Sequence, residues 1–303
     1  MLKIKKLSHY LNFQRAQHPS IVNWRENSIN DSLFYSYRST DYTRQTYPAQ
    51  LHYHDYYELV IFVSGDIRYL CGSHSYQPHY GDMILIPPRT LHMSTIQREK
   101  THYTRHVFYL YPDVFDALEC TALSDFLKNQ PEGHYLFPLS AEAREEIFSL
   151  LPRLDQALSR DQQGLDRALA LGFILQIFYL LNQQGPSPAS TSTLLPANVL
   201  EIQRYLDTHF AEITSVAQVA EHFYYSREYL SRLFKQYFHT SVGDYLMKRR
   251  VAYSQSLIAQ GLPLMDACFQ SGFTSVSTFI RSFRSITNMP PSQYRAMLQE
   301  KQE

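Results

Sequence analysis

The spacing of apolar residues changes along the chain and predicts a part rich in β-strands followed by a helical part. Between Gln50 and His106 the apolar residues form runs of about six residues, separated by turn-forming tripeptides. The clearest runs are Leu59–Val63 and Met83–Ile86, and the turns are Ser64-Gly65-Asp66, Cys71-Gly72-Ser73 and Tyr80-Gly81-Asp82. Of the 24 tyrosines, 14 lie between Tyr10 and Tyr111, and tyrosine favours strands. Short strands at this spacing predict a β-barrel or a β-sandwich.

After Pro138 the apolar residues follow a helical period. Ser140 can cap a helix, and the stretch Leu165–Asn182 repeats apolar residues every three or four positions. The repeating residues are Leu169, Phe173, Ile177 and Leu180. We expect this stripe to form the contact of a homodimer, although a helix packed on its own barrel would show the same pattern.

A segment without apolar periodicity separates this region from the C-terminal part of the chain. Residues 185–193 are glycine, proline, alanine, serine and threonine only, which is the composition of an interdomain linker. From Ala197 to the end the period is helical throughout. A chain of 303 residues is expected to form two domains, and the boundary belongs in this segment.

Composition and charge narrow the class of protein. The 28 lysines and arginines balance the 28 acidic residues, so any surface that binds nucleic acid must be local. A hydrophobic fraction of 44 % excludes disorder as the main state, and the three cysteines are too scattered for disulfides or a paired metal site. The first residues lack a signal-peptide core, and the longest apolar run, Ala168 to Leu181, is too short to span a bilayer. We therefore expect a soluble cytoplasmic protein without a membrane partner.

The C-terminal part contains an internal repeat. Two stretches match at an offset of 48 or 49 residues: Val219-Ala220, Ser226, Leu230, Phe234-Lys235 and Tyr245-Leu246 correspond to Ala267-Cys268, Ser275, Phe279, Phe283-Arg284 and Tyr294-Arg295. In each copy a small residue of a first helix, Ala220 or Cys268, is followed by a turn and then by a helix with a capping serine. This pattern predicts a helix-turn-helix in each copy.

Each second helix has a free face that carries candidate DNA contacts. In the first copy Leu230, Leu233, Phe234 and Tyr237 form the expected buried stripe; in the second copy Phe279 and Phe283 do. The free faces carry Arg227, Glu228, Ser231, Arg232 and Lys235 in the first copy, and Val276, Ser277, Ile280, Arg281 and Arg284 in the second. Arg232 and Arg281 occupy equivalent positions, where a guanidinium can bind guanine or a phosphate, and Val276 and Ile280 suit thymine methyl groups. A solvated helix face with a few packing residues is the alternative.

Residues 198–303 carry 11 Lys and Arg against 9 Asp and Glu, a net charge of only +2. Neutralisation of DNA phosphates must then come from a cluster, and Lys248-Arg249-Arg250 is the candidate. The same triplet could instead be a solvated helix end.

These residues resemble a known family. Residues 198–298 are similar to the double helix-turn-helix DNA-binding domain of the AraC/XylS family of transcription regulators, whose C-terminal signature matches Gly272-Phe273, Phe279, Arg281, Phe283-Arg284 and Pro290-Pro291-Ser292-Gln293-Tyr294-Arg295. The resemblance implies seven helices, with recognition helices at Ser226–Tyr237 and Ser275–Ile286 and a connecting helix at about Val242–Gln260. It also implies a double-stranded DNA partner and contact with RNA polymerase. Tyr224, His239 and Asn288 stand where the family usually has glycine.

The N-terminal half has a second set of polar residues with regular spacing. His52, His54, Tyr56 and Glu58 alternate along one face of an extended segment. Gly81, Pro87 and His92 form a later segment that a barrel could bring opposite the first. Together these segments resemble the two motifs of the cupin fold, H-x-H-x3-E-x6-G and G-x5-P-x4-H. Arg89 and Ile96 depart from the second motif.

The resemblance to cupins implies a polar interior that binds either a ligand or a metal. His52, His54, Glu58 and His92 match the ligand set of a metallo-cupin, which suits Mn, Fe, Ni or Zn. An enzyme of this type would be an oxygenase, isomerase or lyase, but an attached DNA-binding domain makes catalysis unnecessary. We therefore predict no catalytic residues and no cofactor, with a divalent metal in this pocket as the alternative.

Aromatic rings beside a few polar groups suit a sugar, whose C–H faces stack on the rings. The candidate ligand-binding residues are Trp24, Tyr35, Tyr37, Arg38, His54, Tyr56, Glu58, Tyr69 and His92. Among the histidines of the metal-ligand set, His52 is the one most easily explained as an ordinary residue of the barrel wall.

The sequence as a whole predicts an α+β chain of two domains. We expect a cupin-like, ligand-sensing β-barrel at 1–138 with a helical dimerisation segment at 139–184, a linker at 185–197, and an all-α double helix-turn-helix domain at 198–303. The expected function is a homodimeric, DNA-binding transcription regulator that responds to a small molecule, a sugar, and activates a carbohydrate-utilisation operon. The alternatives are a metal-binding cupin enzyme or metal sensor with an accessory DNA-binding domain, and a DNA-architectural protein whose binding is indifferent to small molecules.

Overall fold

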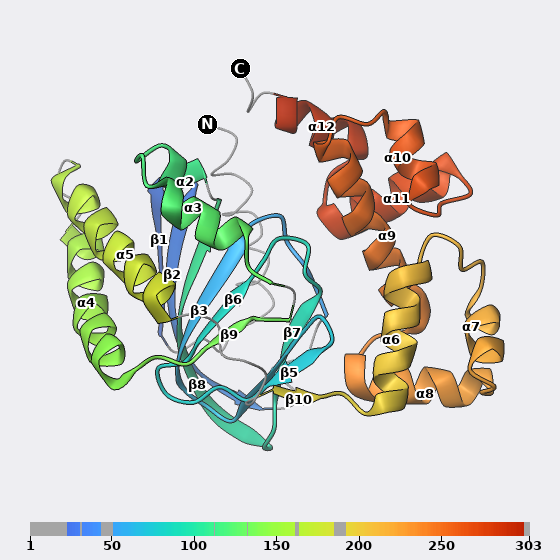
Figure 1. Cartoon of the computed structure of the whole chain (residues 1–303), viewed down its shortest axis with the longest axis horizontal. Coiled ribbons are helices and arrows are strands. Elements are labelled where there is room, and N and C mark those ends of the chain that lie inside the picture. Colours follow the sequence, from blue (N-terminus) through green and yellow to red (C-terminus); the bar gives the residue numbers. More distant parts are fainter. Residues whose placement is uncertain are drawn as a thin grey trace. The chain divides into compact units, whose positions relative to one another are not determined.

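The computed structural model describes residues 23–30, 32–43, 51–111, 113–131, 133–160, 164–184 and 192–299. The chain divides into two compact units (Figure 1). Unit 1 comprises Met1–Ala49 and His54–Thr193, and unit 2 comprises Gln50–Tyr53 and Leu194–Glu303. The β-rich and all-helical parts predicted from the apolar spacing correspond to these two units.

Unit 1 contains two β-sheets. The larger has the strand order β1-β2-β8-β3-β6-β9 and the smaller has the order β10-β5-β4-β7. The strands are β1 (Asn23–Asn30), β2 (Leu33–Thr43), β3 (Tyr57–Ser64), β4 (Ile67–Cys71), β5 (His74–Tyr76), β6 (Met83–Ile86), β7 (His92–Ile96), β8 (Lys100–Leu110), β9 (Leu136–Phe137) and β10 (Ser192–Leu194). The predicted turns at Gly65, Gly72 and Gly81 are present, and each of these glycines has a positive φ.

Successive residues along the strands of the larger sheet point to opposite faces and belong to two different hydrophobic cores. On β8, Phe108 and Leu110 join a core that the helices cover, whereas Val107 and Tyr109 join a core with residues of the smaller sheet. The second core lies between the two sheets and includes Tyr69. The sheet faces therefore define which residues can reach the interior between the sheets.

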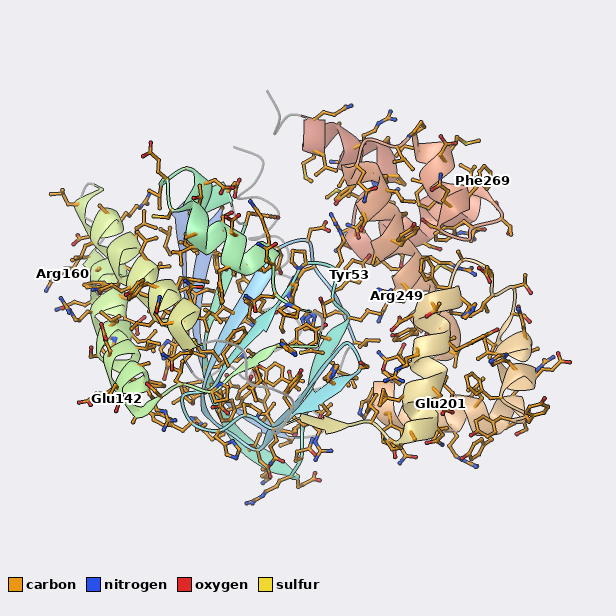
Figure 2. The ribbon with its side chains drawn as sticks, viewed as in Figure 1. Tyr53, Glu142, Arg160, Glu201, Arg249 and Phe269 are labelled. Carbon is orange, nitrogen blue, oxygen red and sulfur yellow. The ribbon has the colours of Figure 1, made fainter. Side chains whose placement is uncertain are left out.

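Helices α2 (Asp113–Asp116), α3 (Thr121–Lys128), α4 (Ala141–Arg160) and α5 (Leu165–Gln184) belong to the first of these cores. Ser140 caps α4 as predicted, because its hydroxyl accepts a hydrogen bond from the Ala143 N–H at 3.1 Å. Figure 2 draws the side chains and labels Glu142 and Arg160 in the first and last turns of α4.

The stripe predicted as the dimer contact mostly packs inside unit 1. Phe173 and Ile177 on α5 are 6 % and 0 % exposed and belong to its core, and Leu180 packs against them, so the alternative of a helix packed on its own domain holds for these residues. Apolar side chains that α5 does leave exposed are Leu165, Leu169 and Tyr179. At 20 residues, α5 is longer than the run judged too short for a bilayer, and it is long and apolar enough to cross one by length and composition. One face of α5 packs on the core of unit 1.

Unit 2 contains seven helices within the described residues, as the resemblance implied. They are α6 (Ala197–His209), α7 (Val216–His222), α8 (Arg227–Phe238), α9 (Val242–Ala259), α10 (Leu264–Gln270), α11 (Val276–Thr287) and α12 (Pro291–Gln299). Ser226 caps α8 by accepting a hydrogen bond from the Tyr229 N–H, whereas Ser275 at the start of α11 makes no such bond. The small residues Ala220 and Cys268 are buried, as close packing of two helices requires.

All three positions where the family usually has glycine adopt the left-handed backbone conformation that favours glycine. Tyr224 has φ = 56°, His239 has φ = 50° and Asn288 has φ = 59°. His239 and Asn288 end the two recognition helices. The backbone of this family pattern is therefore kept although the residue type is not.

The basic triplet on α9 is half-buried and bonded to other segments of unit 2, which corrects its prediction as a free phosphate-binding cluster. Arg249 forms an ion pair with Asp207 of α6 at 2.7 Å. Arg250 donates to the backbone oxygens of Phe210 and Ile213, and Lys248 donates to the backbone oxygen of Leu51. These charges tie α9 to its neighbours, which the local sequence could not show.

The predicted linker is partly structured. Its residues Ser192–Leu194 form β10 beside β5, and α6 begins at Ala197. Residues 185–191 lie outside the described part of the chain.

Candidate functional site

The first candidate surface is the outer face of α8. Its core side is formed by Leu230, Phe234 and Phe238, which are all 0 % exposed. Leu233 and Tyr237, predicted to be buried, are only half-buried. The five predicted contact residues are exposed: Arg227, Glu228, Ser231, Arg232 and Lys235. The helix therefore offers three cations and two hydrogen-bonding side chains to a partner.

Arg232 is oriented by an aromatic neighbour. Its guanidinium carbon lies 5.7 Å from the centre of the Tyr229 ring, within the range of a cation–π interaction. Tyr225 in turn packs edge-on against Tyr229, with ring centres 4.8 Å apart. This contact restricts the rotamers of Arg232, so less side-chain entropy is lost when the guanidinium binds.

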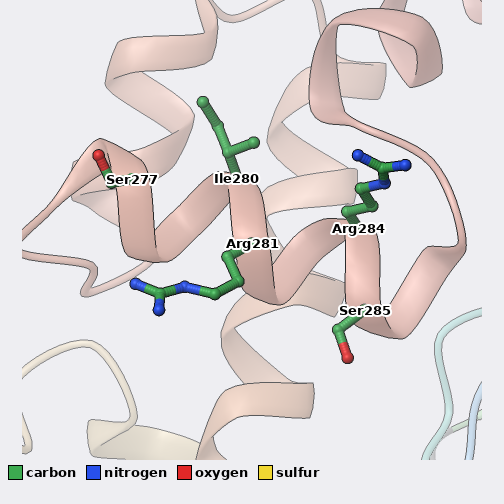
Figure 3. Close-up of a pocket in the computed structure, with 5 residues that line it drawn as sticks. All are labelled: Ser277, Ile280, Arg281, Arg284 and Ser285. Atoms are coloured by element: carbon green, nitrogen blue, oxygen red, sulfur yellow. The ribbon is translucent and has the colours of Figure 1, made fainter.

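The outer face of α11 forms the second candidate surface (Figure 3). Ser277, Ile280, Arg281, Arg284 and Ser285 line a pocket on this face, and Ile280 is 43 % exposed. Val276 differs from its prediction, because it is half-buried and packs against the core formed around Phe279 and Phe283. Its apolar character has an internal reason, so Ile280 alone is left as the apolar contact for a thymine methyl group.

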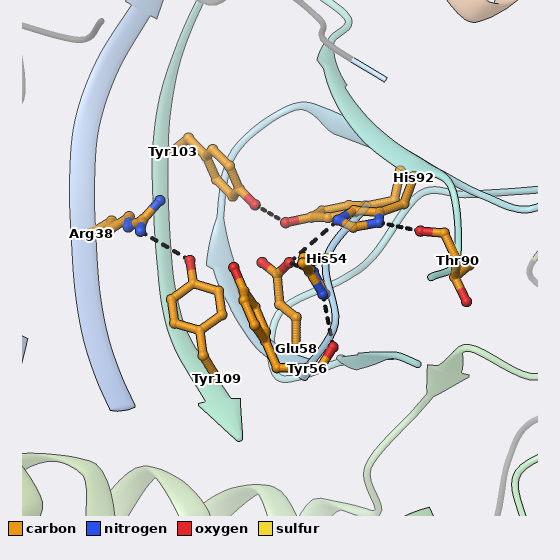
Figure 4. Close-up of polar contacts among 9 residues, drawn as sticks. Arg38, His54, Tyr56, Glu58, Thr90, His92, Tyr103 and Tyr109 are labelled. Carbon is orange, nitrogen blue, oxygen red and sulfur yellow. Dashed lines mark hydrogen bonds and ion pairs between the residues drawn. The ribbon is translucent and has the colours of Figure 1, made fainter. Parts of the chain in front are cut away.

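Apart from the two helix faces of unit 2, a polar cluster in unit 1 is a candidate site for a ligand or a metal (Figure 4). The Nε2 atom of His54 lies 2.9 Å from the Glu58 carboxylate, and the Nε2 atom of His92 lies 3.4 Å from the same oxygen. His54 stacks on Tyr56 with ring centres 4.1 Å apart. The three groups come from the end of the segment before β3, from β3 and from β7, so the two sheets meet at this cluster.

The tautomers of both histidines follow from their other ring nitrogens. The Nδ1 atom of His54 is 2.8 Å from the backbone oxygen of Tyr56, and that of His92 is 2.8 Å from the backbone oxygen of Thr90. A carbonyl oxygen only accepts, so both Nδ1 atoms carry hydrogen. Each Nε2 atom then faces the Glu58 carboxylate, where a proton or a metal ion can lie between the nitrogen and the oxygen.

This donor set fits a divalent metal. Histidines that bind a metal through Nε2 usually donate Nδ1–H to a carbonyl or carboxylate, as both rings do here. Two histidines and one carboxylate form a common set for Fe, Mn or Zn. Bond lengths of about 2.1 Å to one ion in tetrahedral geometry place the donor atoms roughly 3.4 Å apart, close to the separations found here.

Burial and charge act in opposite directions on Glu58. Burial by itself would raise the pKa of this carboxyl, but hydrogen bonds with His54 and His92 hold the pKa well below its usual range. The pKa of His54 is lowered, chiefly because the ring is buried. The cluster therefore contains a carboxylate anion at neutral pH.

A second polar region lines the same interior on β2 and β8. Arg38 and Arg105 are directly opposite in the strand pairing and are 5 % and 7 % exposed. Arg38 donates to the Tyr109 hydroxyl at 2.9 Å, and the guanidinium of Arg105 lies 4.0 Å from the centre of the Tyr103 ring. The hydroxyls of Tyr103 and Tyr69 are hydrogen-bonded to each other. Directly paired residues share a face of the sheet, so both arginines face the same space.

Several predicted ligand residues are not at this site. Tyr35 lies on the opposite face of β2, in the core that the helices cover, where it bonds to His106 at 2.8 Å and to Asp155 at 2.9 Å. Tyr37 also packs on that side, 4.9 Å from the His106 ring. Burial lowers the pKa of His106 to about 4, so this ring is neutral. Tyr35 and Tyr37 therefore do not share the interior that holds the other predicted ligand residues.

The remaining predicted residues are placed as follows. Trp24 lies in β1, paired with Arg38, and its side chain is outside the described part of the structure. His52 belongs to Gln50–Tyr53, which groups with unit 2 rather than with His54. Arg38, His54, Tyr56, Glu58, Tyr69 and His92 all belong to the interior between the sheets.

Sequence reasoning missed Arg105 and Tyr109. Each alternates on β8 with residues of the helix-covered core, so strand parity was a signal for both. Without the register of β8 against β2, nothing in the sequence placed Arg105 beside Arg38.

Sequence profiles of known families match both units. The family described as an AraC-like ligand binding domain matches residues 35–178, and the family described as a helix-turn-helix domain matches residues 219–297. The two matches fall on the β-rich and the all-helical units, respectively.

Individual proteins also match over most of the chain. The uncharacterized HTH-type transcriptional regulator YbfI of Bacillus subtilis is 26 % identical over 75 % of this chain and 79 % of its own length. The HTH-type transcriptional activator RhaS of an Enterobacter species is 23 % identical over 80 % of this chain and 86 % of its own length. Among solved structures, ToxT of Vibrio cholerae is 16 % identical over 87 % of this chain and 98 % of its own, with a TM-score of 0.34.

Proposed function

The chain belongs to the AraC family of DNA-binding transcription regulators, and from this premise we propose that it reads duplex DNA with α8 and α11 in response to a small molecule held in unit 1. The observation that carries the proposal is the pair of exposed faces in one seven-helix unit, each with an arginine at the equivalent position. Two recognition helices in one chain can enter consecutive major-groove segments.

We propose a sugar as the effector and activation of a carbohydrate-utilisation operon as the outcome. The interior between the sheets supports a sugar, because it combines aromatic rings with directed polar groups such as Arg38 and Glu58. A relative described as a transcriptional activator supports the sign of regulation. Activation implies contact with RNA polymerase and action in the cytoplasm. In this proposal the chain has no catalytic residues, in keeping with relatives that are transcription regulators.

Selection of DNA from a randomised duplex pool tests the DNA-binding part of the proposal. The full chain is expected to enrich a sequence with two short conserved blocks, one for each recognition helix, and to bind it about 1,000-fold or more tightly than an unrelated duplex at the same salt concentration. Failure to enrich any sequence would contradict sequence-specific reading. A panel of monosaccharides then shows whether a sugar changes the affinity for the enriched duplex.

We propose that the chain forms a homodimer through the exposed face of α5. Leu165 is 80 % exposed, Leu169 is 51 % exposed and Tyr179 is 58 % exposed, which favours an apolar contact with a second copy. Light scattering of the full chain is expected to give twice the 35.5 kDa of one chain. Leu169→Glu is expected to reduce this to a single chain at micromolar concentration, whereas Gln156→Glu on α4 leaves it unchanged. A monomeric wild type would refute the dimer.

A metal in unit 1 is the second candidate, favoured by the two Nε2 atoms that face the Glu58 carboxylate. His54, Glu58 and His92 would hold the ion, which would supply a Lewis-acid contact for effector hydroxyls. After loading with Zn, Mn, Fe or Ni and desalting, the full chain is expected to retain about one ion. His92→Ala is expected to lower the affinity more than about 100-fold, and His79→Ala, an exposed histidine, is expected to have no effect. A wild type that retains no ion leaves these residues as ligand contacts.

A further inference from the structure

The turn between α7 and α8 repeats in the turn between α10 and α11. The N–H of Tyr224 donates to Glu221 and that of Tyr225 donates to Ala220; the N–H of Gly272 donates to Phe269 and that of Phe273 donates to Cys268. These pairs share one offset along the chain, so Tyr224 is the structural counterpart of Gly272. Both residues have positive φ, 56° and 81°.

The two residues differ in what their surroundings require. A Cβ atom on Gly272 would lie 2.5 Å from the backbone of Ala211, so no side chain fits there. Tyr224 is 96 % exposed, so its ring buries almost nothing in its own unit. The left-handed backbone disfavours any residue with a Cβ atom. A tyrosine at this position therefore weakens the fold relative to glycine and gains nothing from internal packing.

The position of Tyr224 relative to the recognition helix indicates a use for the ring. In a helix-turn-helix the first helix crosses the DNA backbone while the start of the second helix enters the major groove. The turn between them passes close to the phosphates at the edge of that groove. Ser226, which caps α8, lies two residues after Tyr224, and the exposed Arg227 lies three residues after Tyr224.

We propose that Tyr224 is a contact to the DNA backbone, with its hydroxyl donating to a phosphate oxygen beside the groove read by α8. Tyrosine hydroxyls are common donors to phosphate oxygens. The inference rests on the proposed DNA-binding function and extends it to a residue outside the predicted recognition faces. Such a contact holds the register of α8 and carries no sequence information.

A neutral donor has a distinctive signature. Lysine and arginine contacts release counterions, so their loss changes the salt dependence of binding, whereas the loss of a tyrosine contact lowers affinity and leaves that dependence unchanged. The effect is also expected to be similar for the enriched duplex and for an unrelated duplex, because phosphates are present in both.

The variants Tyr224→Gly and Tyr224→Phe test the inference in the full chain, by thermal unfolding and by fluorescence anisotropy with both duplexes at several salt concentrations. Tyr224→Gly is expected to raise the unfolding midpoint of unit 2 by about 2–5 °C, because glycine relieves the left-handed backbone. The same variant is expected to weaken DNA binding about three- to tenfold. Tyr224→Phe removes only the hydroxyl and is expected to weaken binding by a similar factor at unchanged stability.

His239→Gly is the matched control, because His239 has the same backbone conformation at the far end of α8. This variant is expected to gain stability and to bind DNA like the wild type. Wild-type affinity in both Tyr224 variants, with the duplex still bound, overturns the inference alone. A wild-type chain that binds no duplex overturns the proposed function together with the inference. An altered salt dependence in Tyr224→Phe would also contradict a neutral contact.

Discussion

Arg232→Ala and Arg281→Ala are each expected to weaken binding to the enriched duplex by about 5- to 150-fold, equivalent to about 1–3 kcal/mol. Both guanidiniums are exposed on the outer faces of α8 and α11, respectively. An arginine can bind guanine through two hydrogen bonds, and truncation to alanine removes both of them. Anisotropy titrations of the full chain at fixed salt measure the change.

The two effects are expected to multiply in the double variant, because the residues lie on separate helices with no shared partner in the described structure. Each variant is also expected to relax the sequence preference within one block of the enriched duplex. Arg204→Ala on α6 removes the same charge outside both recognition helices and serves as the control. If the control weakens binding as much as Arg232→Ala, the assigned faces are wrong and the effect is one of net charge.

Tyr229 gives a further distinction between the two arginines. The Tyr229 ring holds the guanidinium of Arg232, whereas no aromatic ring among the described residues is found to hold Arg281 in this way. Arg232 therefore loses less side-chain freedom on binding. The affinity loss at Arg232 is expected at the upper end of the range.

Local patterns predicted the helical unit well because its helices are set by short-range rules. The recognition helices were expected at Ser226–Tyr237 and Ser275–Ile286 and are found at Arg227–Phe238 and Val276–Thr287. The serine that precedes each helix and the offset between the copies indicated these positions, although only Ser226 forms the capping hydrogen bond. Val276 was misplaced because it lies at the first turn of its helix, where the apolar period is too short to tell a core position from an outer one.

Contacts between distant segments were harder to predict. The basic triplet on α9 looked like a phosphate-binding cluster, but Asp207 and the carbonyl oxygens of Phe210 and Ile213 that bind it are about 40 residues away in sequence. The apolar stripe on α5 was compatible with a dimer contact and with a core, and only the packing of Phe173 and Ile177 distinguished the two.

In the candidate effector site, the odd or even number of a residue on a strand predicts the face of the sheet on which it lies, but not its partner on the next strand. Tyr35 and Tyr37 have odd numbers on β2 and Arg38 has an even number, so the three could not share one face of a regular strand. That signal was present in the sequence. The pairing of Arg38 with Arg105 was not, because it depends on the register between strands that are far apart in the chain.

Gly272→Ala is expected to destabilise unit 2 by about 3 kcal/mol or more. The left-handed backbone costs about 1–2 kcal/mol for a residue with a Cβ atom, and forced overpacking adds about 1–3 kcal/mol. The added Cβ atom would lie 2.5 Å from both the Cα atom and the backbone oxygen of Ala211. Main-chain atoms cannot rotate away as a long side chain can, so the turn or the Ala211 segment must move. Differential scanning calorimetry is expected to show a lower transition for unit 2 and an unchanged transition for unit 1.

Gly261→Ala separates the two contributions. Gly261 also has a positive φ, 91°, but no atom lies within 4 Å of the position its Cβ would take. This control is expected to cost only the backbone term of about 1–2 kcal/mol. Equal losses in the two variants would show that Ala211 moves aside without cost.

The contact between Gly272 and Ala211 also affects how firmly α8 and α11 are held in position relative to each other. Ala211 follows α6, in the half of unit 2 that contains α8, and Gly272 lies in the turn between α10 and α11. A backbone-to-backbone contact at this point leaves little freedom for α11 to shift relative to the first half. Gly272→Ala is therefore expected to weaken binding to the enriched duplex more than to a duplex that keeps only the block read by α8, at a temperature where the variant is still folded. Equal weakening on both duplexes would mean that α9 alone sets the spacing of the two helices.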